Sequence, residues 1–557
     1  MKWRWRKQNG RELDPEEIFL DSSNLPRFDV NQFEGRIEQP IKKSAFYILG
    51  GAAFLAALVF IGRLAELQII RGTALAARSA SNILRQIPIF AERGIITDRN
   101  AVELAWNDQK GRVYIDKPGF GHLLGYISYP NEKELAGEKF YPEELVGRDG
   151  VEKLFNDRLQ GESGIKIEEH NAKGEIESDH VLKPPLPGHD LVLAIDGRVQ
   201  EPLNRAINEL VAEGRFVAGA GVIMDVHTGE LVALSSVPEY DPNVLARGDD
   251  VAKINSYLTD SRQLFLNRAV AGVYTPGSIV KPIMALAALS EGIINPEKKI
   301  LSTGALVLPN PFFPDQPTVF KDWKAHGWVD LRQALAASSN VYFYTVGGGF
   351  GDQAGLGIAN IAKYAEKFGL GRPTGIEFSN EESGLVPTPA WKAKTFDGEA
   401  WRLGDTYHTA IGQYGFQVTA VQMARAVAAL ATGGKLVRPT VLAKKDVEPV
   451  AAEMIEGIKP EHFQIVREGM RLSVTNGIAA GLNAPYVEVA AKTGTAELGL
   501  TREEVNSWVT GFFPYQAPQY AFAVVLERAK RNNQVGAIFA MRQALDVIHQ
   551  TAPEYFD

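Results

Sequence analysis

An uncharged apolar segment at residues 45–62 constrains the fold of this 557-residue chain more than any other feature. Its sequence is AFYILGGAAFLAALVFIG, and Lys42, Lys43 and Arg63 bracket it. Such a run is long enough to span a bilayer as a helix, and it exceeds the apolar core of a signal peptide. A cleavable signal would also begin closer to the N-terminus. We therefore predict a retained single-pass membrane anchor, with the whole chain that follows on one side of the membrane.

Basic residues set the predicted orientation of the anchor. Lysine and arginine occur on both sides of the apolar segment, but the chain also begins with a basic cluster that includes Lys2 and Arg4. Cytoplasmic flanks carry the excess of positive charge in membrane proteins. We therefore expect residues 1–43 to form a cytoplasmic tail and residues 44–62 to anchor the chain in the cell (inner) membrane. The large C-terminal part then lies outside the cytoplasm.

The composition excludes several classes of function. Apolar residues make up 45% of the chain and charged residues 23%, which is ordinary for a globular protein. The net charge of −8 is opposite to that of a nucleic-acid-binding surface. The chain has no cysteine, so disulfides and thiolate zinc sites are impossible.

A proline- and glycine-rich stretch, KPPLPG at residues 183–188, divides the part beyond the anchor. We expect one domain at residues 63–188 and another at residues 189–557. The second domain has strand patterns near both ends and helical patterns between them. The expected strands are residues 218–225, 230–235, 487–491, 508–513 and 520–526. This order predicts an α+β domain with one antiparallel sheet whose first and last parts meet.

A serine and a lysine three residues apart begin a candidate site. Ser278 follows the turn pair Pro276-Gly277 and opens an apolar run that stops near Gly292. We expect Ser278 at or near the N-terminus of a helix, with Lys281 on the face of the serine hydroxyl. A serine is a poor nucleophile until a base takes its proton, and a lysine among apolar neighbours favours its neutral form. Ser278 is therefore the expected nucleophile and Lys281 its base.

A second motif, Ser338-x-Asn340, follows a short helical pattern at residues 331–337. We expect a loop here. The hydroxyl of Ser338 could relay a proton, and the amide of Asn340 could donate and accept hydrogen bonds towards a peptide backbone.

The third motif is Lys492-Thr493-Gly494-Thr495, which occurs once and follows a strand pattern. We expect Lys492 at the rim of a cleft, where it binds a carboxylate together with the hydroxyls of Thr493 and Thr495. Gly494 has no side chain, so a substrate backbone could lie alongside as an added strand. The backbone N–H groups of Ser278 and Thr495 are the expected oxyanion hole.

Short motifs of this kind also arise by chance. Ser163-x-x-Lys166 matches the first pattern and Ser22-x-Asn24 matches the second. We interpret both as surface coincidences, because no apolar helix follows Ser163. Three motifs in order, each in a suitable context, form the stronger signal.

With these motifs, the chain after the anchor resembles a class B penicillin-binding protein, a membrane-anchored peptidoglycan D,D-transpeptidase. Further stretches that resemble the family are residues 93–100 (RGIITDRN), 147–152 (GRDGVE), 159–161, 238–243 and 267–269. Residues 321–324 (KDWK) and 404–413 (GDTYHTAIGQ) are similar to the elongation branch. The chain departs from the family in two places. Residues 107–125 are shorter, and Asn340 stands where some elongation-type members carry aspartate.

The resemblance implies a fold and a reaction. A serine penicillin-recognising transpeptidase domain, with an antiparallel sheet flanked by helices plus an all-helical part, would occupy residues 189–557. An elongated, dimerisation-type pedestal would occupy residues 63–188. Ser278 would form an acyl-enzyme with a stem pentapeptide, and an acceptor stem peptide would then resolve it during lateral cell-wall synthesis. β-Lactam antibiotics would acylate the same serine. A SEDS-type glycan polymerase is the expected partner, and no metal, organic cofactor or nucleic acid is expected.

Other functions use the same residue types. A septal (division) transpeptidase would share the whole site. A D,D-carboxypeptidase or a β-lactamase would use water as the acceptor. A membrane-bound β-lactam sensor would acylate without turnover, and a scaffold would have lost catalysis. The large domain before the linker argues against a simple hydrolase, and the small polar N-terminal tail argues against a sensor.

Overall fold

The computed structural model describes residues 42–557 except 110, 138–139, 171–174, 311–312, 314, 445–451 and 500–501. The contacts divide the chain into two compact units, Met1–Arg85 with Glu169–Ser178, and Gln86–Glu168 with Asp179–Asp557. The predicted cytoplasmic tail at residues 1–43 lies almost wholly outside the described residues. The domain boundaries given above stay predictions.

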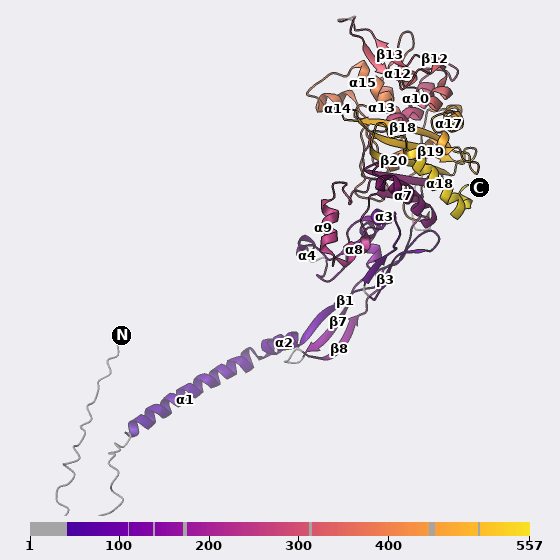
Figure 1. Cartoon of the computed structure of the whole chain (residues 1–557). Helices are drawn as coiled ribbons and strands as arrows, with labels where there is room; N and C mark the ends of the chain where they lie inside the picture. The colour runs from indigo at the N-terminus through magenta and orange to yellow at the C-terminus, as the bar shows by residue number, and fades with distance from the viewer. Residues whose placement is uncertain are drawn as a thin grey trace, which may run out of the picture. The chain divides into compact units, whose positions relative to one another are not determined.

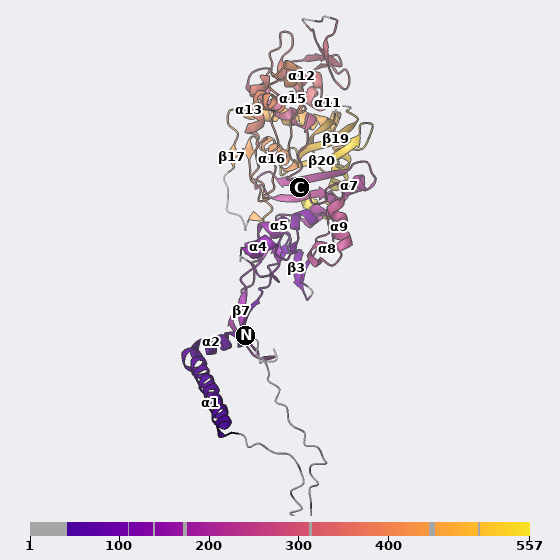
Figure 2. The same ribbon diagram turned by 90° about the vertical axis from the view of Figure 1, so that its left-hand side faces the viewer.

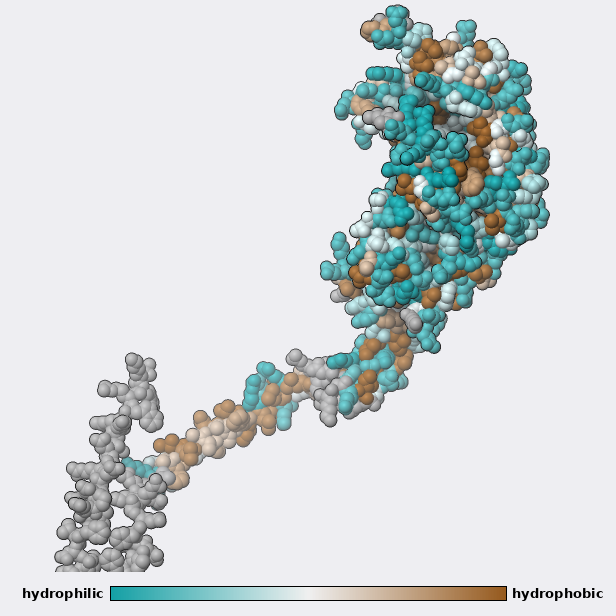
Figure 3. Space-filling model, viewed as in Figure 1, coloured by the Kyte–Doolittle hydropathy of each residue, from teal (hydrophilic) through white to brown (hydrophobic). Residues whose placement is uncertain are grey.

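A long apolar helix is the main element of the first unit. Helix α1 (Lys43–Ala65) continues through a π-helical turn, η2 (Glu66–Ile70), and helix α2 (Gly72–Ile83) follows. No residue of α1 is buried, and apolar side chains cover the surface of this helix in Figure 3. Within the part of the chain that the structure describes, this is the one helix long and apolar enough to span a membrane. The predicted segment at residues 45–62 lies inside it.

Short strands and helices form the N-terminal part of the second unit. A four-stranded sheet has the order β4-β3-β2-β9, in which β9 pairs in parallel with β2. Its strands are β2 (Ile96–Thr97), β3 (Glu103–Asp108), β4 (Gly111–Tyr114) and β9 (Leu191–Val192). Glu152, which is fully buried, accepts hydrogen bonds from Arg93 Nε at 2.6 Å and Arg112 Nε at 2.8 Å. A buried carboxylate is stable here because two guanidinium groups pair with it.

A five-stranded antiparallel sheet is the centre of the second unit, in the order β11-β10-β20-β19-β18 (Figure 1). Its strands are β10 (Ala218–Asp225), β11 (Leu231–Val237), β18 (Ala490–Leu498), β19 (Glu504–Phe513) and β20 (Tyr520–Lys530). Strand β10 pairs with β20, so the early hairpin joins the three late strands, as predicted from the sequence. Strand β18, which carries the third motif, lies at one edge.

Helices cover both faces of this sheet because its strands are apolar on both sides. Helices α7 (Gly197–Ala212) and α18 (Ala537–Thr551) pack with Phe522 and Val524 on one face. Helix α16 (Ala420–Ala431) packs with Val525 on the other face, where it lies against β20 (Figure 2). Every residue of α16 is buried. Alternate residues of β20 thus belong to two different cores.

A mainly helical part adjoins the α16 side of the sheet and contains the first two motifs. Its helices include α10 (Lys281–Ser290), α11 (Leu331–Ala337), α12 (Asn340–Gly348), α13 (Gly357–Lys367), α15 (Leu403–Ala410) and α17 (Pro460–Asn476).

The remaining α-helices of the described chain are α3 (Gly121–Leu124), α4 (Glu132–Ala136), α5 (Gly150–Leu154), α6 (Asn156–Leu159), α8 (Pro242–Arg247), α9 (Val251–Thr259) and α14 (Pro389–Thr395). The other strands are β1 (Leu84–Ile89), β5 (Ile127–Ser128), β6 (Val146–Gly147), β7 (Gly164–His170), β8 (Ile176–Lys183), β12 (Ile300–Ser302), β13 (Ala305–Leu308), β14 (Thr318–Lys321), β15 (Gly327–Val329), β16 (Lys435–Leu436) and β17 (Glu453–Met454).

Glycines allow the segments around Ser278 to approach one another closely. Gly277 and Gly412 both have left-handed backbones, with φ of 57° and 76°. A Cβ atom added at Gly412 would lie 2.1 Å from the carbonyl oxygen of Gly277. Alanine cannot fit at this distance, so the segment after α15 can support the turn before Ser278 only through a glycine.

Replacing Gly412 by alanine should destabilise the chain more than replacing Gly433. Both have left-handed backbones, with φ of 76° and 74°, so the conformational cost is shared. A Cβ at Gly433 would meet nothing within 4 Å. The additional overpacking at Gly412 should cost about 1–3 kcal/mol. Thermal unfolding of the full chain in detergent compares Gly412→Ala with Gly433→Ala, and equal melting temperatures would contradict the packing role of Gly412.

Candidate active site

Ser278 lies in a tight turn that leads into a helix. Residues Gly277–Val280 form a 3₁₀ turn, η3, in which the N–H of Lys281 donates to the carbonyl oxygen of Ser278. Helix α10 begins at Lys281. Ser278 therefore lies near a helix N-terminus, as predicted, and the turn before the helix is 3₁₀. Side chains three residues apart eclipse in a 3₁₀ turn, so Ser278 and Lys281 still share a face.

The amine of Lys281 points to the second motif. Its Nζ donates to the carbonyl oxygen of Ser338 at 2.8 Å, to Ser338 Oγ at 3.3 Å and to Asn340 Oδ1 at 2.7 Å. These three acceptors match the three hydrogens of an ammonium group. In the part of the chain that the structure describes, no hydrogen bond joins the Lys281 amine to the Ser278 hydroxyl. A neutral amine would have a lone pair free to accept from the serine.

The second motif is a two-residue corner between two helices, which is shorter than the loop predicted from the sequence. Ser338 ends α11 in the left-handed conformation, with φ of 54° and ψ of 40°. Ser339 caps the next helix, and Asn340 is the first residue of α12. Left-handed backbone is uncommon outside glycine and often marks a functional site. This corner places the Ser338 hydroxyl and the Asn340 amide against the same amine.

Lys492 is buried, whereas the sequence predicted it at the rim of a cleft. Its side chain extends from β18 into the domain, and the residue is 0% exposed. Its Nζ donates to Ser338 Oγ at 2.8 Å and to the carbonyl oxygen of Thr493 at 2.9 Å. Lys281 and Lys492 therefore meet at one hydroxyl oxygen. Thr495 is exposed and Thr493 is partly exposed, so these two hydroxyls lie nearer the surface.

Burial controls the electrostatics of the two amines. Desolvation lowers the pKa of Lys281 from 10.5 to about 7, although the negative charge of Asp322 opposes the shift. The ring of Phe343, with its centroid 5.4 Å from Nζ, forms part of this apolar environment. Burial, with added repulsion from Lys281, lowers the pKa of Lys492 well below its usual value. The site thus favours a neutral amine at Lys281 near neutral pH.

Gly494 has a packing reason that the sequence did not reveal. A Cβ added to it would lie 2.7 Å from the carbonyl oxygen of Pro276 and 3.0 Å from Ile279 Cγ2. The absent side chain lets β18 pack against the turn that carries Ser278. The sequence interpretation had placed a substrate backbone at this position. The packing of Gly494 against the segment before Ser278 is an additional role, and the substrate contact stays a prediction.

Sequence reasoning missed one buried group beside the site, Asp322. Its segment was noted only for its likeness to the elongation branch. The structure places its carboxylate against the helix corner, where it accepts a hydrogen bond from Ser339 Oγ at 2.8 Å. The sequence pattern could not predict this contact, because β15 and α11 separate the two residues along the chain.

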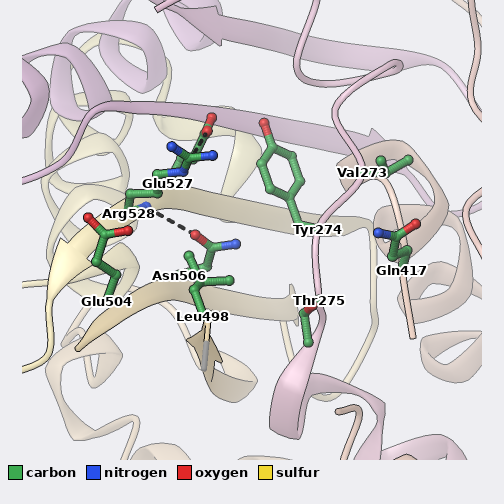
Figure 4. A pocket seen from close by; sticks show the side chains of 10 residues that line it. Val273, Tyr274, Thr275, Gln417, Leu498, Glu504, Asn506, Glu527 and Arg528 are labelled. Carbon is green, nitrogen blue, oxygen red and sulfur yellow. Dashed lines mark hydrogen bonds and ion pairs between the residues drawn. The ribbon is translucent and has the colours of Figure 1, made fainter. Parts of the chain in front are cut away.

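Two cavities in the described part of the chain have linings that do not include the motif residues. One cavity of about 470 Å³ has Tyr274, Thr275, Asn506 and Arg528 in its lining (Figure 4). There the backbone N–H of Arg528 donates to Asn506 Oδ1 at 3.0 Å. A second cavity, of about 780 Å³, is lined mainly by residues of α7 and α18, together with residues from segments 98–104 and 115–120. Neither cavity has a motif residue among its lining residues. The hydrogen bonds of the motif residues therefore define the candidate site.

Comparisons with known proteins give the family. The chain matches the penicillin binding protein transpeptidase domain over residues 219–542 and the penicillin-binding protein dimerisation domain over residues 106–193. Peptidoglycan D,D-transpeptidase MrdA of Salmonella typhimurium strain LT2 is 31% identical over 477 residues, which cover 79% of this chain and 73% of the relative. The protein of the same name from Escherichia coli strain K12 is 28% identical over 610 residues, with coverage of 89% and 93%.

Solved structures agree with the sequence relatives. PBP2 of Pseudomonas aeruginosa, in complex with WCK 5153, has a TM-score of 0.70 and 30% identity, and the match covers 83% of this chain and 96% of that one. A structure described as showing the coordination of polymerization and crosslinking by a peptidoglycan synthase complex has a TM-score of 0.71 and 28% identity, with coverage of 90% and 98%.

The chain therefore belongs to the penicillin-binding protein family, with a transpeptidase domain and a dimerisation domain. Within this family it is a class B protein of the elongation type. The resemblance predicted from the sequence and the predicted fold class are both confirmed.

Proposed function

We propose that this chain is a peptidoglycan D,D-transpeptidase that cross-links stem peptides during lateral cell-wall synthesis through an acyl-enzyme on Ser278. One observation carries the site assignment. The amines of Lys281 and Lys492, from distant parts of the chain, share Ser338 Oγ directly beside the turn that holds Ser278. The family and its relatives support the reaction.

Acylation begins with a proton transfer. Neutral Lys281 accepts the hydroxyl proton of Ser278, and the serine oxygen attacks the carbonyl carbon of the penultimate D-alanine. An oxygen–carbon bond forms, and the carbon–nitrogen bond to the last D-alanine breaks. The leaving nitrogen takes the proton from Lys281 through Ser338, whose hydroxyl contacts both amines. The amine of Lys281 is neutral again at the end of this step.

Deacylation reverses the roles. The amine of an acceptor stem peptide attacks the ester carbonyl, a carbon–nitrogen bond forms, and the bond to the oxygen of Ser278 breaks. The proton released by the amine returns to the serine oxygen through Lys281. The backbone N–H groups of Ser278 and Thr495 stabilise the oxyanion in both steps. Asn340 binds the stem-peptide backbone and also keeps Lys281 in place.

The position of β18 favours binding of an extended peptide. This strand lies at the edge of the five-stranded sheet, so one side of its backbone has no strand partner within the sheet. An edge strand can accept a peptide as an added strand. In this proposal the hydroxyls of Thr493 and Thr495 bind the terminal carboxylate of the substrate. When the substrate carboxylate binds, its negative charge favours protonation of the Lys492 amine, and the resulting positive charge then contributes to binding of the carboxylate.

The membrane arrangement follows the same proposal. Residues 1–43 form a cytoplasmic tail, residues 44–62 a single-pass anchor in the cell membrane, residues 63–188 a pedestal and residues 189–557 the transpeptidase domain outside the cytoplasm. Helix α1 is long and apolar enough for this role. A SEDS-type glycan polymerase is the proposed partner, and the similar structure of a peptidoglycan synthase complex supports it.

Ser278→Ala should abolish covalent labelling by a penicillin. Intact-mass and peptide mass spectrometry of the full chain in detergent would show one stable adduct on the peptide that contains Ser278. The matched control is Ser163→Ala, which removes the serine of the other Ser-x-x-Lys sequence and should label like the wild type. Labelling that persists in Ser278→Ala, or no labelling of the folded wild type, would refute the proposed nucleophile. An adduct that disappears rapidly would favour a hydrolase.

The rate of acylation by a penicillin should rise with pH through a midpoint of about 7, because the active form of Lys281 is the neutral amine. Below the midpoint the ammonium form dominates and the rate falls. Stopped-flow or gel measurements of the acylation rate constant across this pH range test the sign. Lys281→Met should reduce the rate by about 10²–10⁴-fold. Lys363→Met removes a surface lysine paired with Glu291 and should have no effect. A rate that is constant across neutral pH would contradict the role of Lys281.

A further inference from the structure

A single buried carboxylate connects several separate segments next to the second motif. Asp322 follows β14, and its side chain is 0% exposed. Its Oδ2 accepts from Ser339 Oγ at 2.8 Å, from the N–H of Val341 at 2.9 Å and from Ser302 Oγ at 3.2 Å. Its Oδ1 accepts from the N–H of Trp323 at 2.9 Å. Both carboxylate oxygens are therefore occupied.

These contacts fix the helix corner on both sides of the proposed catalytic residues. Ser339 and Val341 alternate with Ser338 and Asn340 along the chain, so holding the first pair orients the second. The neighbouring Trp323 adds a third attachment, because its Nε1 donates to the carbonyl oxygen of Ala337 at 3.1 Å. Hydrogen bonds to Asp322 and Trp323 therefore hold the chain at Ala337, Ser339 and Val341, which lie just before, within and just after the motif.

The corner needs such support because its geometry is unfavourable by itself. Ser338 is held in the left-handed region, with φ of 54°. Such a conformation persists only where surrounding contacts determine it. Without them, Ser338 could relax, and its carbonyl and hydroxyl oxygens would leave the amine of Lys281.

The charge of Asp322 also acts on the site. Burial by itself would raise the pKa of this carboxyl, but hydrogen bonds from Val341, Asn340 and Ser339 together hold it below its usual value. The group is therefore a carboxylate at neutral pH. Its negative charge opposes the desolvation that lowers the pKa of Lys281.

Other titratable groups surround this pair. Lys492 faces Lys281 across Ser338, and His326 and Tyr344 lie near Asp322. His326 Nε2 lies 3.6 Å from Asp322 Oδ1, and burial lowers the pKa of this histidine. His326 is therefore neutral at and above pH 7. Asp322 is the negatively charged group that acts on Lys281.

We infer that Asp322 is a positioning residue for the acyl transfer. Through Ser339 and Val341 it holds the corner in the one arrangement that brings Ser338 Oγ and Asn340 Oδ1 to the Lys281 amine. This inference rests on the proposed function, because it assumes that Ser278 is the residue acylated. Asp322 itself touches neither the substrate nor the reacting atoms.

The test measures acylation of the full chain by a fluorescent penicillin as a function of pH. Asp322→Asn should lower the acylation rate constant by about 10- to 100-fold, the scale of a reacting group displaced by about 1 Å. The acidic limb of the pH–rate profile should also move to lower pH, because the ammonium form of Lys281 loses a nearby negative charge. Loss of structural support alone would lower the rate without moving the limb.

Asp330→Asn is the matched control. Asp330 caps the N-terminus of α11, the helix that ends at Ser338, and asparagine caps a helix equally well. This variant likewise removes one negative charge, here from the helix that leads into the corner, and should leave both the rate and the limb unchanged.

Ser339→Ala separates geometry from charge and remains informative if Asp322→Asn does not fold. It removes the hydrogen bond from Ser339 Oγ to Asp322 and the cap that Ser339 gives to the N–H of Tyr342, but it keeps the carboxylate, so the rate should fall while the limb stays in place. Wild-type rates in folded Asp322→Asn or Ser339→Ala would overturn the inference. The inference would also be overturned if the lower acylation rate of Asp322→Asn were fully explained by its unfolded fraction and the acidic limb of its pH–rate profile did not move. Failure of the wild type to label at Ser278 would instead refute the proposed function.

Discussion

Two buried amines that share one hydroxyl oxygen are the interaction on which the rest of the site depends. Lys281 comes from α10 and Lys492 from the edge strand β18, and both donate to Ser338 Oγ. An amine removed from water is costly unless it is hydrogen-bonded or loses its charge. Helix, strand and corner must therefore all be in place for the cluster to be stable. The same burial lowers the pKa of Lys281 to about 7, where it can act as a base.

Close backbone packing holds these elements together. Gly494 lets β18 pack against the turn at Ser278, and Gly412 supports the same turn through Gly277. Asp322 fixes the helix corner that carries Ser338. The proposed nucleophile thus lies on a turn with backbone contacts on two sides, while the residue remains partly exposed. Rigid support beneath an accessible reactive group is what acyl transfer requires.

Much of this organisation could be predicted from sequence because it is local or periodic. The apolar segment, the early hairpin and the three late strands were predicted, and the structure contains all of them. The sequence predictions were wrong or incomplete where distant contacts override local pattern. Lys492 is buried and does not lie at a cleft rim, and the sequence did not show that the turn at Ser278 is 3₁₀ or that the connection at Ser338 has only two residues.

The sequence by itself determined which chemical groups the site has, because the motif that contains each residue is short and continuous. It could not determine their environment. Lys492 lies 154 positions from Ser338, and only the tertiary structure buries its amine against that hydroxyl. The role of Asp322 likewise appears only when β14 and the helix corner meet. Burial and hydrogen bonding set pKa values and orientation, and both depend on neighbours that the order of residues does not specify.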